Sequence, residues 1–195
     1  LGGNNAAQYH ASGSPPEEKS KRRPTLARIK DTAGLRGIQD VVLFNGDNCL
    51  VFARDKDRVG DPVAASLSGN QLSWIAVFTA GEGAEPQGLL CARVGNEFRA
   101  WDTFVRSGAV FSGVRREGGG ENHASLPFEP AKGYHILAVV WDGAHDRLRQ
   151  WLTTPDGKTV HSTAVSGTTD FGDLTEVRLG ALNRDNNGAT TMSYL

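Results

Sequence analysis

The chain has 195 residues, which is long enough for one all-β domain with a sizeable core. Its 21 basic and 22 acidic residues nearly cancel, and this balance disfavours a surface that follows nucleic-acid phosphates. No run approaches the roughly 20 apolar residues of a membrane helix, so we expect neither nucleic-acid binding nor membrane insertion. The 24 Gly residues and the single Met favour many short strands and turns.

Residues 1–34 are polar and predict an irregular N-terminal segment. A mixed charge cluster at residues 17–23 is typical of a solvated loop, and its acidic members disfavour a basic docking patch. The chain is expected to join the body of the domain at Arg23–Leu26. Both ends of the sequence look cut, so the lack of a signal peptide says little about the compartment.

The middle of the chain predicts a series of short strands separated by Gly, Asn or Ser breaks. The apolar run at residues 72–80 has two apolar faces, which predicts a central strand of a sheet. Residues 118–122 predict a flexible excursion before the next strand. The remaining strands expected in this part are residues 39–44, 49–53, 89–94, 97–105 and 109–115.

The C-terminal third begins with the clearest hairpin of the sequence. Residues 134–141 are apolar on both faces and predict a central strand, whereas residues 147–153 alternate and predict a strand with one wet face. Pro155-Asp156-Gly157 is a turn signal, because Pro fixes φ and Gly supplies a left-handed residue. Further strands are expected at residues 158–165, 176–182 and 190–195.

This count of about ten to eleven strands, without a repeat or a linker, predicts a single domain over residues 1–195. The expected fold is an antiparallel two-sheet β-sandwich or jelly roll.

Several segments together resemble the concanavalin A-like lectin/glucanase superfamily, and within it the laminin-G-like jelly-roll modules of bacterial proteins. The resembling segments, which span about 160 residues, are residues 23–26, 41–48, 72–80, 134–141, 148–151 and 176–183. The resemblance implies that the first and last strands of the family lie outside this sequence, before Leu1 and after Leu195. It also implies an extracellular or cell-surface location and further domains in the parent chain.

Within this superfamily some members are carbohydrate-active enzymes and others only bind. The β-glucanase pattern ExDxxE, which places carboxylates on one strand face, is absent, and Glu97, Asp102, Glu117, Glu121 and Glu176 are isolated. The sequence also lacks GxSxG, HExxH and P-loop motifs. The five histidines are scattered and are expected to be surface or strand-face residues.

The preferred hypothesis is therefore a non-catalytic recognition module that binds carbohydrate or a protein partner. A glycoside hydrolase or polysaccharide lyase with an atypical site and a ligand-free spacer domain are the alternatives.

Two tryptophans are candidates for a ligand platform, because an exposed ring stacks on a sugar face while polar neighbours bind the hydroxyls. Trp151 shares the wet face of its strand with Arg149. Trp101 lies beside Arg99 and is the second candidate. For both rings, packing under a loop is the competing interpretation. Trp74 and Trp141 are expected in the core.

Metal binding is considered because rim loops rich in Asp and Asn oxygens can hold Ca²⁺. The first candidate is the loop with Asn183, Asp185, Asn186 and Asn187. Two further oxygen-rich loops lie at residues 45–48 and 55–61, and turn chemistry is the competing explanation for all three.

Cys49 and Cys91 lack zinc-ligand spacing, and we expect two buried thiols, with a disulfide as the alternative.

Overall fold

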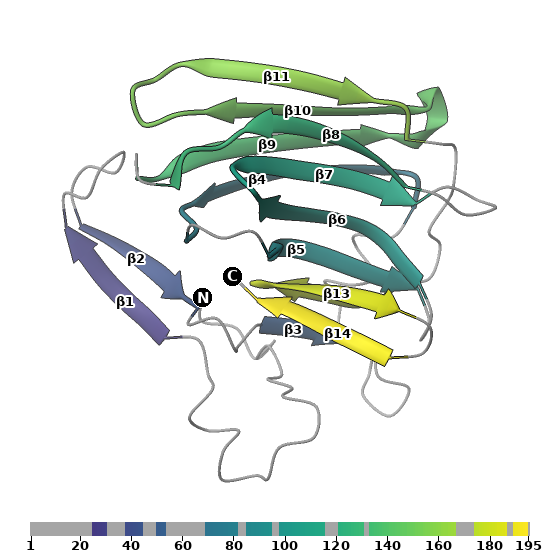
Figure 1. The fold of residues 1–195 in the computed structure, drawn as a ribbon, viewed down its shortest axis with the longest axis horizontal. Coiled ribbons are helices and arrows are strands. Elements are labelled where there is room, and N and C mark those ends of the chain that lie inside the picture. The colour runs from purple at the N-terminus through teal and green to yellow at the C-terminus, as the bar shows by residue number, and fades with distance from the viewer. Residues whose placement is uncertain are drawn as a thin grey trace, which may run out of the picture.

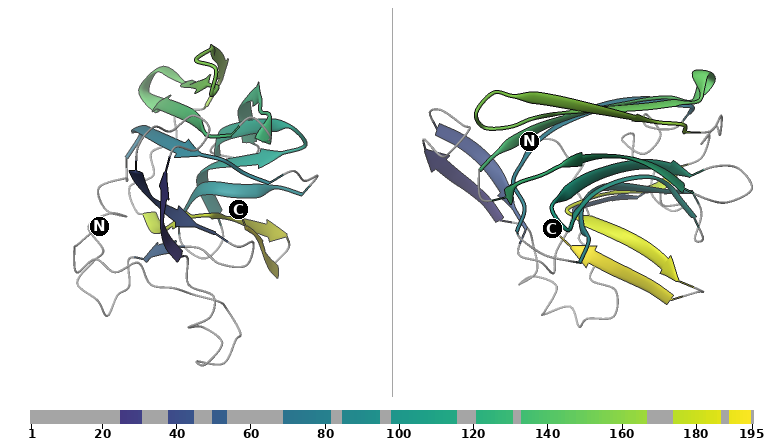
Figure 2. Two further views of the ribbon diagram at one scale, coloured as in Figure 1. Left: turned by 90° about the vertical axis from the view of Figure 1, so that its left-hand side faces the viewer. Right: turned by 45° about the horizontal axis from the view of Figure 1, so that its top comes forward.

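The protein is a sandwich of two antiparallel sheets with a hairpin at each end of the chain (Figure 1). The structure is a computed structural model, which describes residues 25–30, 38–44, 50–53, 69–81, 85–94, 98–115, 121–130, 133–166, 174–186 and 189–194. Figure 2 shows the two sheets lying over one another as layers, the arrangement of a β-sandwich. The predicted antiparallel two-sheet sandwich is therefore confirmed.

The described residues form fourteen strands and a one-turn 3₁₀ helix at Gly143–His145. The strands are β1 Thr25–Lys30, β2 Ile38–Leu43, β3 Leu50–Ala53, β4 Gln71–Phe78, β5 Gln87–Val94, β6 Phe98–Arg106, β7 Ala109–Arg115, β8 Glu121–Pro127, β9 His135–Asp142, β10 Arg147–Thr153, β11 Thr159–Ala164, β12 Leu174–Leu179, β13 Ala181–Asn186 and β14 Ala189–Tyr194. Among these residues no helix is long and apolar enough to cross a membrane.

The first layer is a four-stranded sheet in the order β11-β10-β9-β4. Its strands alternate, because one face packs on the core and the other faces outward. In β9 the inward residues Leu137, Val139 and Trp141 are buried, while Ile136 is 45% exposed. The prediction that this strand is central is confirmed, since β9 pairs with both β10 and β4.

The position of β4 corrects one expectation. Its two apolar faces predicted a central strand, but among the described strands β4 pairs with β9 alone and forms an edge of its sheet. The prediction was wrong because an apolar run on both faces also arises where an edge strand stays partly uncovered.

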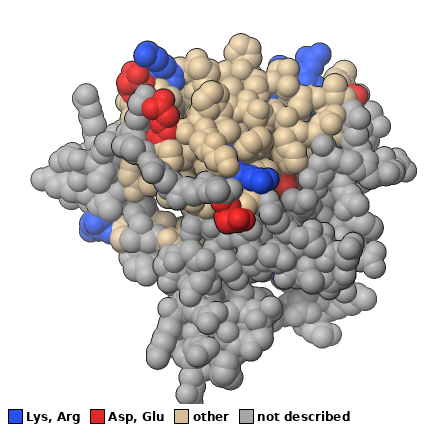
Figure 3. Space-filling view, viewed as in Figure 1, with Lys and Arg blue, Asp and Glu red and all other residues tan. Residues whose placement is uncertain are grey.

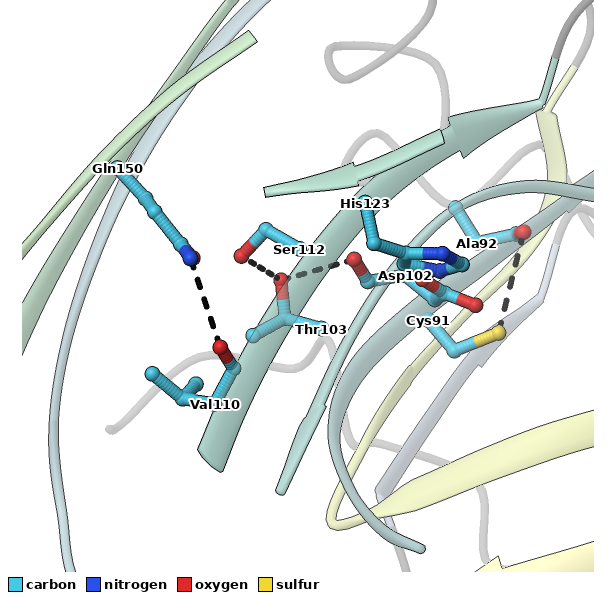
Figure 4. Close-up of polar contacts among 8 residues, drawn as sticks. All are labelled: Cys91, Ala92, Asp102, Thr103, Val110, Ser112, His123 and Gln150. Atoms are coloured by element: carbon cyan, nitrogen blue, oxygen red, sulfur yellow. Dashed lines mark hydrogen bonds and ion pairs between the residues drawn. The ribbon is translucent and has the colours of Figure 1, made fainter. Parts of the chain in front are cut away.

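The second layer is a six-stranded sheet in the order β3-β12-β5-β6-β7-β8. One face of this sheet packs on the four-stranded sheet and supplies Trp101, Val110, Val114, Leu126 and Val177 to the shared core. Within that core Thr103 and Ser112 face one another with their hydroxyl oxygens 3.0 Å apart. Gln150 of β10 reaches across and donates from Nε2 to the Val110 carbonyl at 3.4 Å, which links the two layers (Figure 4).

The β13–β14 hairpin lies beside β5 and β6, on the side of the six-stranded sheet that faces away from the other layer (Figure 2). Gly180 makes this possible, because it turns the chain between β12 and β13 with a φ of 79°. The sequence predicted one strand over residues 176–182, and this turn divides it.

Two strands were not predicted. β1 lies inside the segment expected to be irregular, and β8 begins where a flexible excursion was expected. Neither has a strict apolar alternation; β8 reads ENHASLP. The predicted turn at Gly157 is confirmed by its φ of 83°.

Candidate functional site

The outward face of the four-stranded sheet has a polar half on β10 and β11. Trp151 and Arg149 both point outward from β10, as the alternation of this strand predicted, and both are half-buried where an exposed ring was expected. The guanidinium carbon of Arg149 lies 5.7 Å from the centre of the Trp151 ring, within the range of a cation–π contact. Strand register places the exposed His161 opposite Trp151 and the exposed Thr163 opposite Arg149.

Hydroxyl groups continue this polar half along the strands. Thr153 and Thr159 are paired across β10 and β11, and their hydroxyl oxygens are 2.9 Å apart. A half-buried indole ring is thus surrounded by a guanidinium, an imidazole and three threonines, groups that can donate or accept hydrogen bonds. We call this set (Arg149, Trp151, Thr153, Thr159, His161 and Thr163) the tryptophan face.

The other half of the same sheet face, on β9 and β4, is aliphatic. Ile75, Val77 and Ile136 are 73%, 50% and 45% exposed, and the strand register places Val77 opposite Ile136. Large exposed aliphatic side chains that lie together are typical of a surface that meets another molecule. Figure 3 has the view of Figure 1, in which β4 lies behind β7, and on this near side the upper part of the described surface is mostly uncharged, with Lys, Arg, Asp and Glu at its margins.

The outward face of the six-stranded sheet carries a row of chemically active side chains that the sequence did not connect. The register places Arg178, Cys91, Asp102, Gly113 and His123 side by side on five successive strands. The Nε2 atom of His123 lies 3.2 Å from Oδ1 of Asp102, although a strand separates the two residues (Figure 4).

Gly113 is the residue that allows this contact. A Cβ atom at this position would lie 2.5 Å from Nε2 and 3.0 Å from Cγ of His123. Real Cβ atoms do not approach so closely, so only Gly lets the imidazole cross β7. A glycine in the middle of a predicted strand is the sequence signal that could have indicated such a close approach.

Aromatic rings surround the imidazole. Phe104 and Phe111 are stacked with centroids 5.1 Å apart, and His123 meets both rings edge-on, at 5.4 Å and 6.3 Å. The side chain of Asp102 is 3% exposed and that of His123 22%. The β13–β14 hairpin lies beside β5 and β6, which accounts for the burial of Asp102 and Cys91 on a face turned away from the main core.

Two further reactive side chains are buried in the described part of the chain. His135 is fully buried on β9, and its Nδ1 lies 2.8 Å from the Gly133 carbonyl oxygen. Cys91 is fully buried, as expected, with Sγ 3.9 Å from the Ala92 carbonyl oxygen. Cys49 lies outside the described residues, so the disulfide alternative stays untested.

Two carboxylates at the turns on either side of β10 have lowered pKa values. Nδ1 of His145 lies 2.8 Å from Oδ2 of Asp142. This hydrogen bond is the main reason why the pKa of Asp142 lies below its usual value. A hydrogen bond from the Thr154 hydroxyl is the main cause that lowers the pKa of Asp156. Both residues lie at tight turns that adjoin β10, and their side chains are 24% exposed in Asp142 and 50% in Asp156.

The second platform candidate is corrected by the structure. Trp101 is 4% exposed and belongs to the core between the sheets, so it cannot present its ring to a ligand. The prediction failed because β6 turns Trp101 toward the four-stranded sheet, a direction that the sequence around it does not reveal. The side chain of Arg99 lies outside the described residues.

The first calcium candidate is also corrected. Asn183, Asp185 and Asn186 lie in strand β13, paired with β14, and do not form the loop that was expected. Asn187 and the candidates at residues 45–48 and 55–61 lie outside the described residues. Within the described part of the chain no three His, Cys, Asp or Glu side chains are grouped to hold a metal ion.

Comparison with known proteins gives no family for the chain. No protein-family model matches it, and no curated protein matches its sequence. Among solved structures, the carbohydrate-binding module CBM40 of the Ruminococcus gnavus IT-sialidase, bound to α2,3-sialyllactose, is similar over 75% of this chain and 80% of that chain, at 18% identity and a TM-score of 0.47.

Two other solved structures are similar over smaller shares of their own length. Domains LG4-5 of the mouse laminin α1 chain match 81% of this chain and 41% of that chain, at 14% identity and a TM-score of 0.48. The binding domain of botulinum neurotoxin DC in complex with SialylT matches 88% of this chain and 44% of that chain, at 9% identity and a TM-score of 0.44. Membership of the concanavalin A-like superfamily stays a prediction.

Proposed function

We propose that the protein is a non-catalytic recognition module of a larger secreted or cell-surface protein, and that it binds carbohydrate through the tryptophan face. The observation that carries this proposal is the half-buried Trp151 ring, held on the outward sheet face beside Arg149. An indole ring offers an apolar platform for the C–H face of a sugar.

The groups around the ring support the same ligand class. Sugar hydroxyls need hydrogen-bond donors and acceptors placed close to the stacking platform. Arg149 supplies donors only, whereas the hydroxyls of Thr153 and Thr163 and the imidazole of His161 can act in either sense. The strands that carry these side chains are paired, so the backbone positions of the tryptophan face are set before a ligand binds.

Two candidate functions remain beside this one. The aliphatic half of the same sheet face favours a protein partner, because Ile75 and Val77 offer no hydrogen bonds to a sugar. A glycoside hydrolase would need a second carboxylate at about 5–10 Å from Asp102. Of the carboxylates whose side chains the structure describes, Asp102 alone lies on the outward face of the six-stranded sheet, and it contacts His123.

The test is a glycan array followed by affinity electrophoresis in gels that contain each polysaccharide found. We expect retardation of the native protein and its loss in Trp151→Ala. Ile75→Thr is the matched control, because it changes another exposed residue of the same sheet face outside the tryptophan face. Binding that survives Trp151→Ala but is lost in Ile75→Thr would contradict the proposed site.

A further inference from the structure

β4, which is an edge among the described strands, lacks the features of its own sequence that usually protect an edge strand. Its eight residues, QLSWIAVF, include no charge and no Pro, and its pairing with β9 runs through eight consecutive residue pairs without a bulge. Edge strands of native proteins are normally protected by charged residues, Pro or a bulge, because their free N–H and C=O groups can pair with another strand.

The side chains of β4 are also incompletely covered toward the core. Leu72, Trp74 and Ala76 point inward and are only partly buried. Their partners across the strand pair, Trp141, Val139 and Leu137, are 2%, 3% and 0% exposed. Among the described residues the core is therefore closed at β9 and only partly covered at β4, so another strand beside β4 would complete it.

The outward row of β4 points to the same conclusion. Ile75 and Val77 are 73% and 50% exposed, the two most exposed large hydrophobic side chains among the described residues. A strand paired with β4 would cover part of both, and no charged side chain of β4 would oppose its approach.

We propose that a second copy of this chain fills this edge by antiparallel pairing of β4 with β4 about a two-fold axis at Ile75. Two four-stranded sheets then join into one continuous sheet. A register centred on Ile75 keeps core-facing residues opposite core-facing residues, as a continuous sheet requires. A two-fold, self-complementary interface is the commonest arrangement of homo-oligomers.

The side chains fit this register. Trp74 lies opposite Ala76 of the second copy, so a large ring meets a small side chain on the core side. Leu72 lies opposite Phe78, and on the outward side the two Ile75 side chains meet at the axis. Pairs of this kind, apolar and unequal in size, stabilise neighbouring strands.

Sedimentation velocity across micromolar concentrations tests the proposal with this chain. We expect a monomer–dimer equilibrium, and we expect Ile75→Lys to raise the dimer Kd by about tenfold or more, because it places two ammonium groups opposite one another. Ile136→Lys is the matched control: it puts the same charge on the same sheet face one strand away from the edge, and it should leave Kd nearly unchanged.

A cysteine variant gives an independent readout. Directly opposite residues of antiparallel strands have Cα atoms about 4.5–5.5 Å apart, within disulfide range. Ile75→Cys should therefore form a covalent dimer under mild oxidation, whereas Ile136→Cys should not. A protein that stays monomeric in sedimentation, or Ile75→Cys that cross-links no more than Ile136→Cys, would overturn the proposal. Trp151→Ala should still dimerise, so the result is independent of carbohydrate binding.

Discussion

Gly113→Ala is the substitution whose effect the structure defines most sharply. The new methyl group would lie 2.5 Å from Nε2 of His123, and the imidazole would have to leave its place above β7. Overpacking of this kind costs about 1–3 kcal/mol of the free energy of unfolding. Displacement of the ring also removes its contact with Asp102, whose side chain is 3% exposed, and the loss of one hydrogen bond costs about 0.5–1.5 kcal/mol.

Urea unfolding of four proteins measures this effect: the native protein, Gly113→Ala, His123→Ala and the double variant. In the His123→Ala background the ring is gone, so adding Gly113→Ala should change the free energy of unfolding by no more than about 0.5 kcal/mol. The coupling between the two positions is then close to the cost of Gly113→Ala alone. Equal costs in both backgrounds would refute the idea that Gly113 is required by the imidazole.

Three further predictions concern other parts of the molecule. Trp101→Ala should lower the free energy of unfolding by about 3–5 kcal/mol in urea, because the ring is in the core, whereas Trp151→Ala should cost about 1 kcal/mol. Gly180→Ala should lower the melting temperature, because its φ of 79° costs about 1–2 kcal/mol for a residue with Cβ; an unchanged transition would refute this. Thr154→Val should raise the pKa of Asp156 toward its usual 3.8, observed by NMR titration of the carboxyl carbon.

The lowered pKa of Asp156 also determines how the stability of Thr154→Val should depend on pH. The folded pKa of Asp156 lies below its unfolded value, so its stabilising contribution is complete above the unfolded pKa. The contribution is lost as the pH falls through the folded pKa. The valine variant should therefore differ from the native protein at neutral pH and converge with it in acid. A pKa of Asp156 that is identical in both proteins would contradict the assigned hydrogen bond.

The sequence predicted the strands well wherever side chains alternate or an apolar run is bounded by turn residues. Residues 147–153 became β10 with the expected wet face, because alternation indicates which side chains are buried. Residues 134–141, which are apolar on both faces, became the central strand β9. β8 was missed because its apolar residues are few and are interrupted by polar ones. Gly180, a single residue with positive φ, divided a run that looked continuous.

The contacts between side chains of different strands depend on which strands pair and in which register, and the local sequence does not determine either. His123 and Asp102 are 21 residues apart, and only the order of β6, β7 and β8 brings them together. The direction of Trp101 and the edge position of β4 were likewise set by which strands pair. By contrast, the Arg149–Trp151 pair could be predicted, because the two residues are separated by one position on a strand with one wet face.

The most direct test of the central claim is the NMR signal of the indole N–H groups during titration with an oligosaccharide found on the array. The protein has four tryptophans and therefore four such signals, and the one absent from Trp151→Ala is assigned to Trp151. We predict that the ligand shifts this signal in a saturable way and leaves the core signals of Trp101 and Trp141 in place. A saturating ligand that shifts only the core signals, or no indole signal, would contradict recognition through the tryptophan face.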